Sequence, residues 1–232
     1  MRITRIFVGC TTIEKYKKIL LNQGQQHYLS NVIRLPKNSD VLIFNSKDGE
    51  WLAKFEKDYV IPHQQSRIQV QEYSYEITVC FAIPKSKTLK TIIRQSTELG
   101  ATTLQPIHSD HTVNRIKDTD KLELWSIEAA QQCRRMSIPR ILSPISFQEI
   151  SIQYKNVIIC DETSEDATVC DIPILNSYTI VIGPEGGFSP AELSLEGHRI
   201  SLGKMVLRCD TAVVAAISQI RAVHSHLTRP IS

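Results

Sequence analysis

Hydrophobic and polar positions follow one rhythm up to about residue 72 and another after it. Four short runs in the first part have the composition of β-strands: Ile3–Val8, Val41–Phe44, Glu50–Phe55 and Arg67–Glu72. Ser46–Gly49 supplies a turn between two of these runs, and Gln25–Ile33 is the one short stretch with a helical pattern. The first 72 residues therefore predict a small, mostly β module.

From Tyr75 onward, predicted strands alternate with predicted helices. The strands are Glu76–Ile83, Thr102–Ile107, Asn156–Cys160, Tyr178–Ile182 and Ile200–Leu202. The helices are Thr88–Leu99, which Gly100 ends, Lys121–Cys133 and Asp210–Leu227. Such alternation is typical of an α/β domain with a mainly parallel sheet. We expect two domains, residues 1–72 and 73–232.

The last helix is unusual because Ala212–Ile217 is apolar nearly all round. A helix of this kind is buried on more than one side. In a chain of this size a subunit interface is a natural way to cover the additional face.

Two glycine-containing bends carry the candidate chemistry. The run Tyr178–Ile182 ends in Gly183-Pro184-Glu185-Gly186-Gly187-Phe188. Ser189 then has the pattern of a helix N-cap, with Pro190 at the first helical position and Glu192 closing a capping box. Glycines let a ligand approach the backbone closely, and a helix start adds N–H donors. We interpret this bend as a small-molecule cradle, and a purely structural turn is the alternative.

A second bend follows about twenty residues later. Leu202–Ala212 again passes from a short strand through a polar turn into a helix. Neither bend has the spacing of the phosphate loop G-x-x-x-x-G-K-[ST] or of the dinucleotide motif G-x-G-x-x-G. The ligand of the cradle is therefore not predicted by those two motifs.

Composition narrows the class of protein. The chain has 232 residues, 42% hydrophobic and 22% charged, and no apolar run approaches the ~18–20 residues of a membrane helix. The N-terminus lacks the apolar segment of a signal peptide, so we expect a cytoplasmic protein with no membrane contact. Six scattered cysteines form no C-x-x-C pair, and we expect no metal site.

Charge is distributed unevenly, although the net charge is only +3. Residues 1–72 hold 11 Lys and Arg against 7 Asp and Glu, a balance of +4, and the remaining residues hold 16 against 17, a balance of −1. A basic small module beside a near-neutral larger one fits contact with nucleic acid, and chance asymmetry is the alternative.

With both bends in place, the chain resembles the RsmE-type 16S ribosomal RNA uridine-N3 methyltransferase family of the SPOUT superfamily. The resemblance spans essentially the whole chain. The segments that carry it are His27 with Val32–Leu35, Thr97–Gly100, Gln132–Pro139, Val181–Ser189 and Ser201–Ala212. The paired bends in this order and spacing are its specific part.

The resemblance implies an N-terminal PUA-like β-barrel that binds RNA and a C-terminal domain with a deep trefoil knot. It also implies S-adenosylmethionine as methyl donor, a homodimer, and uridine 1498 of 16S rRNA in the small ribosomal subunit as substrate. Methyl transfer to this base requires loss of the imide proton, which a nearby cation or general base would assist.

Site residues follow from the two bends and from nearby cations. The expected cofactor contacts are Ile182, Gly183, Pro184, Glu185, Gly186, Gly187, Leu202, Gly203, Val206, Leu207 and Thr211. Arg208 is the expected catalytic residue, and a salt bridge to Asp210 or Glu185 is its structural alternative. The expected RNA contacts are His27, Arg34, Lys85, Lys87 and Arg94.

The chain departs from the family pattern at several positions. A common Glu-Gln-x-Gly-Arg run is Gln131-Gln132-Cys133-Arg134-Arg135 here, and the arginine that usually follows the Leu-Gly turn is replaced near Met205. Two other functions therefore stay open. One is methylation of a different RNA position, and the other is a cofactor-binding ribosome-assembly factor without turnover.

Overall fold

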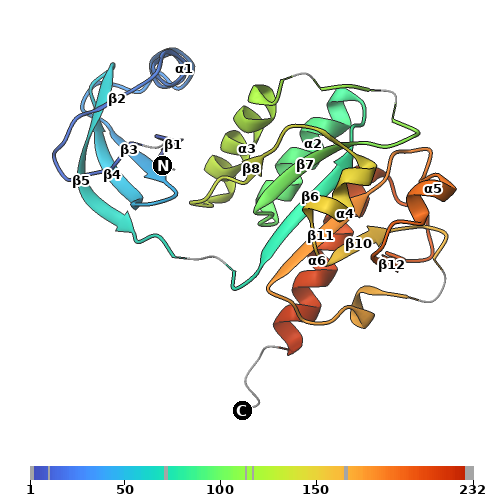
Figure 1. Ribbon diagram of the computed structural model, residues 1–232. Helices are drawn as coiled ribbons and strands as arrows, with labels where there is room; N and C mark the ends of the chain where they lie inside the picture. Colours follow the sequence, from blue (N-terminus) through green and yellow to red (C-terminus); the bar gives the residue numbers. More distant parts are fainter. Residues whose placement is uncertain are drawn as a thin grey trace. The chain divides into compact units, whose positions relative to one another are not determined.

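The computed structural model describes residues 3–9, 11–70, 73–112, 114–116, 118–164 and 167–227 (Figure 1). The chain divides into two compact units. Unit 1 consists of Met1–Glu72 with Ala130–Ile138, and unit 2 consists of Tyr73–Ala129 with Pro139–Ser232. The sequence pattern did not predict that residues 130–138 belong with the first unit.

A curled five-stranded sheet forms most of unit 1. Its strands, in spatial order, are β1 (Arg5–Phe7), β3 (Asp40–Asn45), β4 (Gly49–Phe55), β5 (Tyr59–Arg67) and β2 (Ile19–Leu20). The β1–β3 pair is parallel and the other pairs are antiparallel. The strands β1 and β2 are the two edges of this sheet. The sheet curls into a half-barrel around a core that includes Leu29, Ile43 and Phe55.

The predicted strand Arg67–Glu72 is wrong. The strand β5 ends at Arg67, and Gln71 and Glu72 lie outside the described residues. Pro62 lies inside β5, opposite Ala53 beside a register shift, and a proline in such a run argues against a strand in sequence-based analysis. The expected helix is also divided, into α1 (Gln23–His27), capped by Asn22, and the π-helical turn η1 (Tyr28–Val32).

Residues 130–138 attach to unit 1 through both hydrogen bonds and apolar packing. Gln131 Oε1 accepts a hydrogen bond from the backbone N–H of Phe7 at 3.0 Å. Ala130 and Met136 are buried against Phe44 in a small apolar cluster. Contacts between segments this far apart in the sequence leave no periodic signal.

Unit 2 is built on a parallel sheet. Its strands, in spatial order, are β12 (His198–Ile200), β10 (Val157–Cys160), β11 (Ser177–Ile182), β6 (Glu76–Ala82), β7 (Thr103–His108) and β8 (Arg140–Ile141), with β9 (Ile145–Ser146) also paired to β7. All of these pairs are parallel, as the α/β prediction required. The strands β8 and β9 have two residues each, too few to show a period, and β12 begins two residues before its predicted start.

Helices and helical turns cover both faces of this sheet. They are α2 (Ser86–Glu98), α3 (Asp120–Cys133), η2 (Phe147–Glu149), α4 (Ile150–Gln153), η3 (Val169–Asp171), α5 (Pro190–Leu193) and α6 (Cys209–Leu227). Along β6, Val79 and Phe81 join a core with α2 and α6, while Cys80 and Ala82 join a core with η2 and α4. Burial on both faces explains the nearly continuous apolar run of this strand.

Within the described part of the chain, no helix is long and apolar enough to span a bilayer. Over the same residues, no group of three or more His, Cys, Asp or Glu side chains is placed to hold a metal ion.

Gly49 constrains unit 1 at the start of β4. Its φ is +78°, and a Cβ there would lie 2.3 Å from the backbone oxygen of Arg67. We predict that Gly49→Ala lowers the free energy of unfolding by about 3 kcal/mol, because left-handed strain and a backbone clash add. Gly9→Ala is the control, since Gly9 has φ +66° with open space around it, and should cost about 1 kcal/mol. Equal losses in denaturant titration would contradict the clash.

Candidate functional site

The two glycine bends leave the sheet at the same edge. In the parallel register, Cys160 at the end of β10 pairs with Ile182 at the end of β11 on one side and with Ile200 at the end of β12 on the other. Neighbouring strands lie about 4.8 Å apart, so bends that flank one strand start about 10 Å from each other. Cys209 Sγ donates a hydrogen bond to the carbonyl oxygen of Gly183 at 3.2 Å. The two bends therefore meet across the end of β10.

The first bend leads into α5 with the predicted cap. Ser189 is the N-cap, Pro190 follows it, and Glu192 closes the capping box. The backbone N–H of Ser189 donates to Glu192 Oε2 at 2.8 Å, and that of Glu192 donates to Ser189 Oγ at 3.3 Å. The helix has only four residues. The expectation that this helix start offers its N–H groups to a ligand is therefore wrong for these two groups, because the cap uses them.

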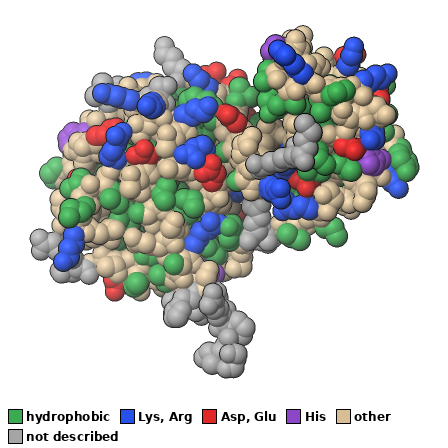
Figure 2. Space-filling model, turned by 180° about the vertical axis from the view of Figure 1, so that it is seen from behind, with side chains coloured by type: hydrophobic (Ala, Val, Ile, Leu, Met, Phe, Trp, Pro, Cys, Tyr) green, Lys and Arg blue, Asp and Glu red, His purple; other side chains and the backbone are tan. Residues whose placement is uncertain are grey.

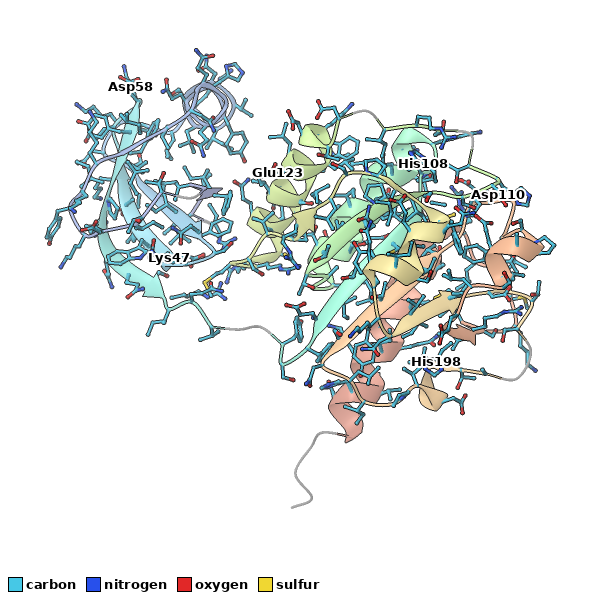
Figure 3. All side chains as sticks on the ribbon, in the orientation of Figure 1. Lys47, Asp58, His108, Asp110, Glu123 and His198 are labelled. Atoms are coloured by element: carbon cyan, nitrogen blue, oxygen red, sulfur yellow. The ribbon has the colours of Figure 1, made fainter. Side chains whose placement is uncertain are left out.

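The loop after β7 holds the first bend in place (Figure 3). Asp110 donates its backbone N–H to Glu192 Oε1 at 2.9 Å and accepts a hydrogen bond from Ser189 Oγ at 2.6 Å. His111 Nδ1 lies 2.9 Å from the carbonyl oxygen of Gly187. Sequence analysis did not assign these residues a role; their position just after a parallel strand was the available signal.

The glycines of the two bends differ in what surrounds the position that a Cβ would occupy. A Cβ at Gly183 would lie 2.9 Å from the ring of Phe188, so the protein's own side chain fills that space. A Cβ at Gly186 would be 3.4 Å from His111. Gly203 has φ +142° and no atom within 4 Å of the position of a Cβ. The space beside the Cα is therefore open to a ligand at Gly203, whereas at Gly183 the ring of Phe188 occupies it.

A shallow hollow lies beside Gly203. It is lined by Cys160, Asp161, Glu162, Leu202, Gly203, Met205, Leu207 and Ala212. Its enclosed volume is about 40 Å³, little more than the ~30 Å³ share of one water molecule, so a larger ligand would lie along the open edge. Leu202 and Leu207 pack against the core of unit 2, whereas Met205 and Val206 are 78% and 76% exposed.

Asp161 and Glu162 are site residues that sequence analysis missed. They follow β10, the strand between the two bends, and the carboxyl end of the predicted strand Asn156–Cys160 was the signal that could have identified them. Burial would raise the pKa of Asp161, but hydrogen bonds from Arg199 and Thr163 outweigh it and hold the pKa below its usual value. Asp161 is therefore a buried carboxylate in its ionised form at neutral pH.

The buried thiols of the site are neutral. Burial, together with the nearby carboxylates of Glu185 and Asp210, raises the pKa of Cys209 to about 11. Burial raises the pKa of Cys160 to about 12. Because the thiolate is the reactive form of cysteine, these residues support structure rather than nucleophilic chemistry.

Comparison with known proteins identifies the family. A family model described as RNA methyltransferase domain matches residues 71–221. The ribosomal RNA small subunit methyltransferase E of Rickettsia conorii is 30% identical over 97% of this chain and 98% of its own length. The Synechocystis protein of the same name is 31% identical over 88% of this chain and 73% of its length. This chain belongs to the ribosomal RNA small subunit methyltransferase E family. It is an RNA methyltransferase.

Solved structures have the same fold. A putative methyltransferase from Legionella pneumophila, in complex with the bound cofactor SAM, aligns with a TM-score of 0.83 and 25% identity over 96% of this chain and 98% of that chain. The ribosomal RNA small subunit methyltransferase E of Neisseria gonorrhoeae aligns with a TM-score of 0.85 and 23% identity over 96% and 98%. The parallel α/β sheet and the half-barrel are thus the fold of the methyltransferase E family.

In this member of the methyltransferase E family, Arg208 is an exposed candidate rather than a buried one. Its side chain is 76% exposed, and its Nε lies 3.8 Å from Asp210 Oδ1. The salt bridge to Asp210 that is the structural alternative is thus present, but an exposed pair at that distance contributes little energy and leaves the guanidinium accessible. Thr211 is exposed beside it.

The expected RNA contacts fall into two groups. His27 and Arg34 are exposed in unit 1, near η1. In unit 2, Lys85 is the N-cap of α2 and Lys87 is exposed in its first turn, both just beyond the carboxyl end of β6. Arg94 donates to both carboxylate oxygens of Glu98 at 3.0 Å, which offsets its charge. On the face in Figure 2, basic side chains are interspersed with acidic ones rather than gathered in one field.

The Asp161–Arg199 pair generates a prediction for this methyltransferase. Because the folded-state pKa of Asp161 is lowered, the stability it contributes is present above the unfolded-state pKa and is lost as pH falls through the folded-state value. We predict that Asp161→Asn lowers the free energy of unfolding at pH 7 by roughly 1–3 kcal/mol. The difference from wild type should shrink in strong acid. A deficit that does not change between pH 7 and acid would contradict the charge assignment.

Proposed function

We propose that this protein transfers the methyl group of S-adenosylmethionine to N3 of a uridine in 16S ribosomal RNA, at the position that the resemblance gives as uridine 1498. The observation that carries the proposal is the meeting of the two bends across the end of β10. Membership in the methyltransferase E family supports the small-subunit RNA as substrate. The choice of uridine and of N3 comes from the resemblance.

The residues of the two bends fit an adenosine-bearing cation. Gly203 leaves its backbone open, and Leu202 and Leu207 supply apolar walls for a nucleoside. Glu162 places an exposed carboxylate at the same hollow, where it complements positive charge, while the charge of Asp161 is paired with Arg199. The expected contacts are Ile182, Gly183, Pro184, Glu185, Gly186, Gly187, Leu202, Gly203, Val206, Leu207 and Thr211. S-adenosylmethionine supplies an already activated methyl group, so alignment dominates the chemistry.

Arg208 acts on the uridine in this proposal. Removal of the imide proton leaves negative charge on the base, and a guanidinium that is free to approach would stabilise it. The exposure of Arg208 and its long contact with Asp210 allow that approach. The same cation would orient the base through its fixed set of N–H groups.

The uridine must be unstacked before it reaches the hollow. Exposed His27, Arg34, Lys85 and Lys87 are the proposed contacts to the RNA backbone, with Arg94 available if it leaves Glu98. We also propose a homodimer formed through unit 2, with the knotted topology of the superfamily, that works on the small ribosomal subunit in the cytoplasm. The half-buried Val214 and Ala215 on α6 are consistent with a further covered face.

Arg208 can be separated from its neighbours by a matched pair of variants. We predict that Arg208→Ala lowers kcat about 100-fold, the usual contribution of one group that stabilises transition-state charge, while the Kd for S-adenosylmethionine changes less than about threefold. Lys204→Ala removes an exposed cation from the same bend and should leave both quantities near wild type. Equal losses of turnover and cofactor affinity in Arg208→Ala would make it a binding residue.

The function is tested by mass mapping of 16S rRNA from the source organism with and without this gene. We expect one missing methyl group at N3 of a uridine, restored when purified protein and S-adenosylmethionine are added to small subunits from the deletion strain. A missing methyl group at another position would identify a different substrate. An unchanged map, with cofactor binding intact by calorimetry, would favour the assembly-factor function.

A further inference from the structure

Unit 1 contains a pocket that the methyl-transfer site does not use. Its volume is about 340 Å³. It is lined by Ile3, Arg5, Leu42, Glu50, Ser66, Arg67, Gln131 and Arg134. All eight residues belong to unit 1, since residues 130–138 pack with the half-barrel. Three of them are arginines and one is a glutamate, which leaves the described lining with a balance of +2.

The side chain of Arg5 is held in place in this pocket by hydrogen bonds from two of its three guanidinium nitrogens. Its side chain is 6% exposed, and its guanidinium carbon lies 3.5 Å from the ring centroid of Phe44. The Nε donates to Glu50 Oε2 at 2.5 Å, and Nη1 donates to the carbonyl oxygen of Ala130 at 2.8 Å. Among the described residues, Nη2 has no hydrogen-bond partner. Because this nitrogen is closed off from solvent, Arg5 lines the pocket as a fixed side chain rather than as a free donor.

The carboxylate of Glu50 does not neutralise Arg67 or Arg134. Its Oε2 accepts from Arg5, and its Oε1 accepts a hydrogen bond from Ser66 Oγ at 3.3 Å. The side chain is buried, so its charge is committed to Arg5. Arg67 and Arg134 are exposed and form no ion pair among the described residues, so they supply the balance of +2 to a ligand from solvent.

Arg134 is held in a strained backbone conformation. Its φ is +62°, in the left-handed region that residues with a side chain rarely adopt. Arg67 Nη1 donates to its carbonyl oxygen at 2.9 Å, which ties the segment to β5. The strain places a long cationic side chain along the pocket where glycine would fit the backbone better. A ligand contact is a physical reason for keeping arginine there.

The pocket is larger than one phosphate requires. Its volume falls at the lower end of the ~300–1,000 Å³ range of small-molecule sites. Leu42 and Ile3 add apolar lining, which suits a base or a ribose next to the charged group. Arginines recognise phosphate with paired N–H groups, and exposed lining residues leave the pocket open to a polymer.

We propose that this pocket binds a phosphate of the substrate RNA backbone together with its attached nucleoside, through the exposed Arg67 and Arg134 beside the fixed Arg5, as an anchor separate from the methyl-transfer site. The proposal rests on the proposed function for the identity of the polymer. The pocket would then fix where the RNA lies on unit 1, while the hollow at the carboxyl edge of unit 2 performs the chemistry.

The test compares two variants, each of which replaces a cationic residue whose backbone φ is positive. Arg134→Gly removes a pocket arginine, and Lys57→Gly removes an exposed lysine with φ +68° in unit 1 that does not line the pocket. Both variants of the full chain should be as stable as wild type or more so, because glycine relieves the strain. Affinity for a short RNA around the methylated uridine is measured by fluorescence anisotropy at several salt concentrations.

We expect Arg134→Gly and Arg67→Ala each to weaken RNA binding about 5- to 20-fold and to reduce the salt slope by about one ion, with the affinity for S-adenosylmethionine unchanged. Lys57→Gly should stay within about twofold of wild type. Wild-type RNA affinity in Arg134→Gly would overturn the proposal. So would binding of inorganic phosphate that depends on Arg134 but does not compete with RNA, since the pocket would then serve a free anion.

Failure of this proposal can be distinguished from failure of the proposed function. If no methyl group is transferred but Arg134→Gly still loses RNA affinity, the anchor stands and the methyl-transfer assignment falls. If methyl transfer occurs and its KM for RNA is the same in Arg134→Gly and wild type, the function stands and the anchor falls.

Discussion

The parallel register of three strands is the constraint on which the proposed methyl-transfer site depends. Because β11 and β12 both pair with β10 in the same direction, segments that are about twenty residues apart in sequence start about two strand spacings apart in space. A shift of one strand by a single residue would turn its side chains to the other face. The bends would then lose both the apolar support of Leu202 and Leu207 and the thiol contact of Cys209.

Much of unit 2 could be predicted because its signals are local. Apolar runs predicted β6, β10 and β11. Gly100, with φ +83°, follows the end of α2 as predicted. Ser189 caps α5, as its spacing from Glu192 indicated. The site was only partly predictable. Phe188 fills the space beside Gly183, and Asp161 was missed, because a glycine or a carboxylate in the sequence does not say which neighbour it faces.

Unit 1 was harder to predict, because its sheet and its pocket depend on distant segments. Pro62 obscured β5, and residues 130–138 return to the half-barrel after more than 50 residues of unit 2. Arg134 departs from the family pattern, and only its positive φ shows what that departure means for the backbone. The resemblance expects glycine at this position, and the backbone has kept the conformation that glycine favours.

The contact between Gly183 and Phe188 couples two positions of the first bend through packing. The ring occupies the space that any side chain at position 183 would need, and it also packs on Phe147 at 5.5 Å between centroids. Enlarging one partner therefore requires shrinking the other. Descendants of this chain would be expected to change the two residues together, and a single replacement would loosen the first bend.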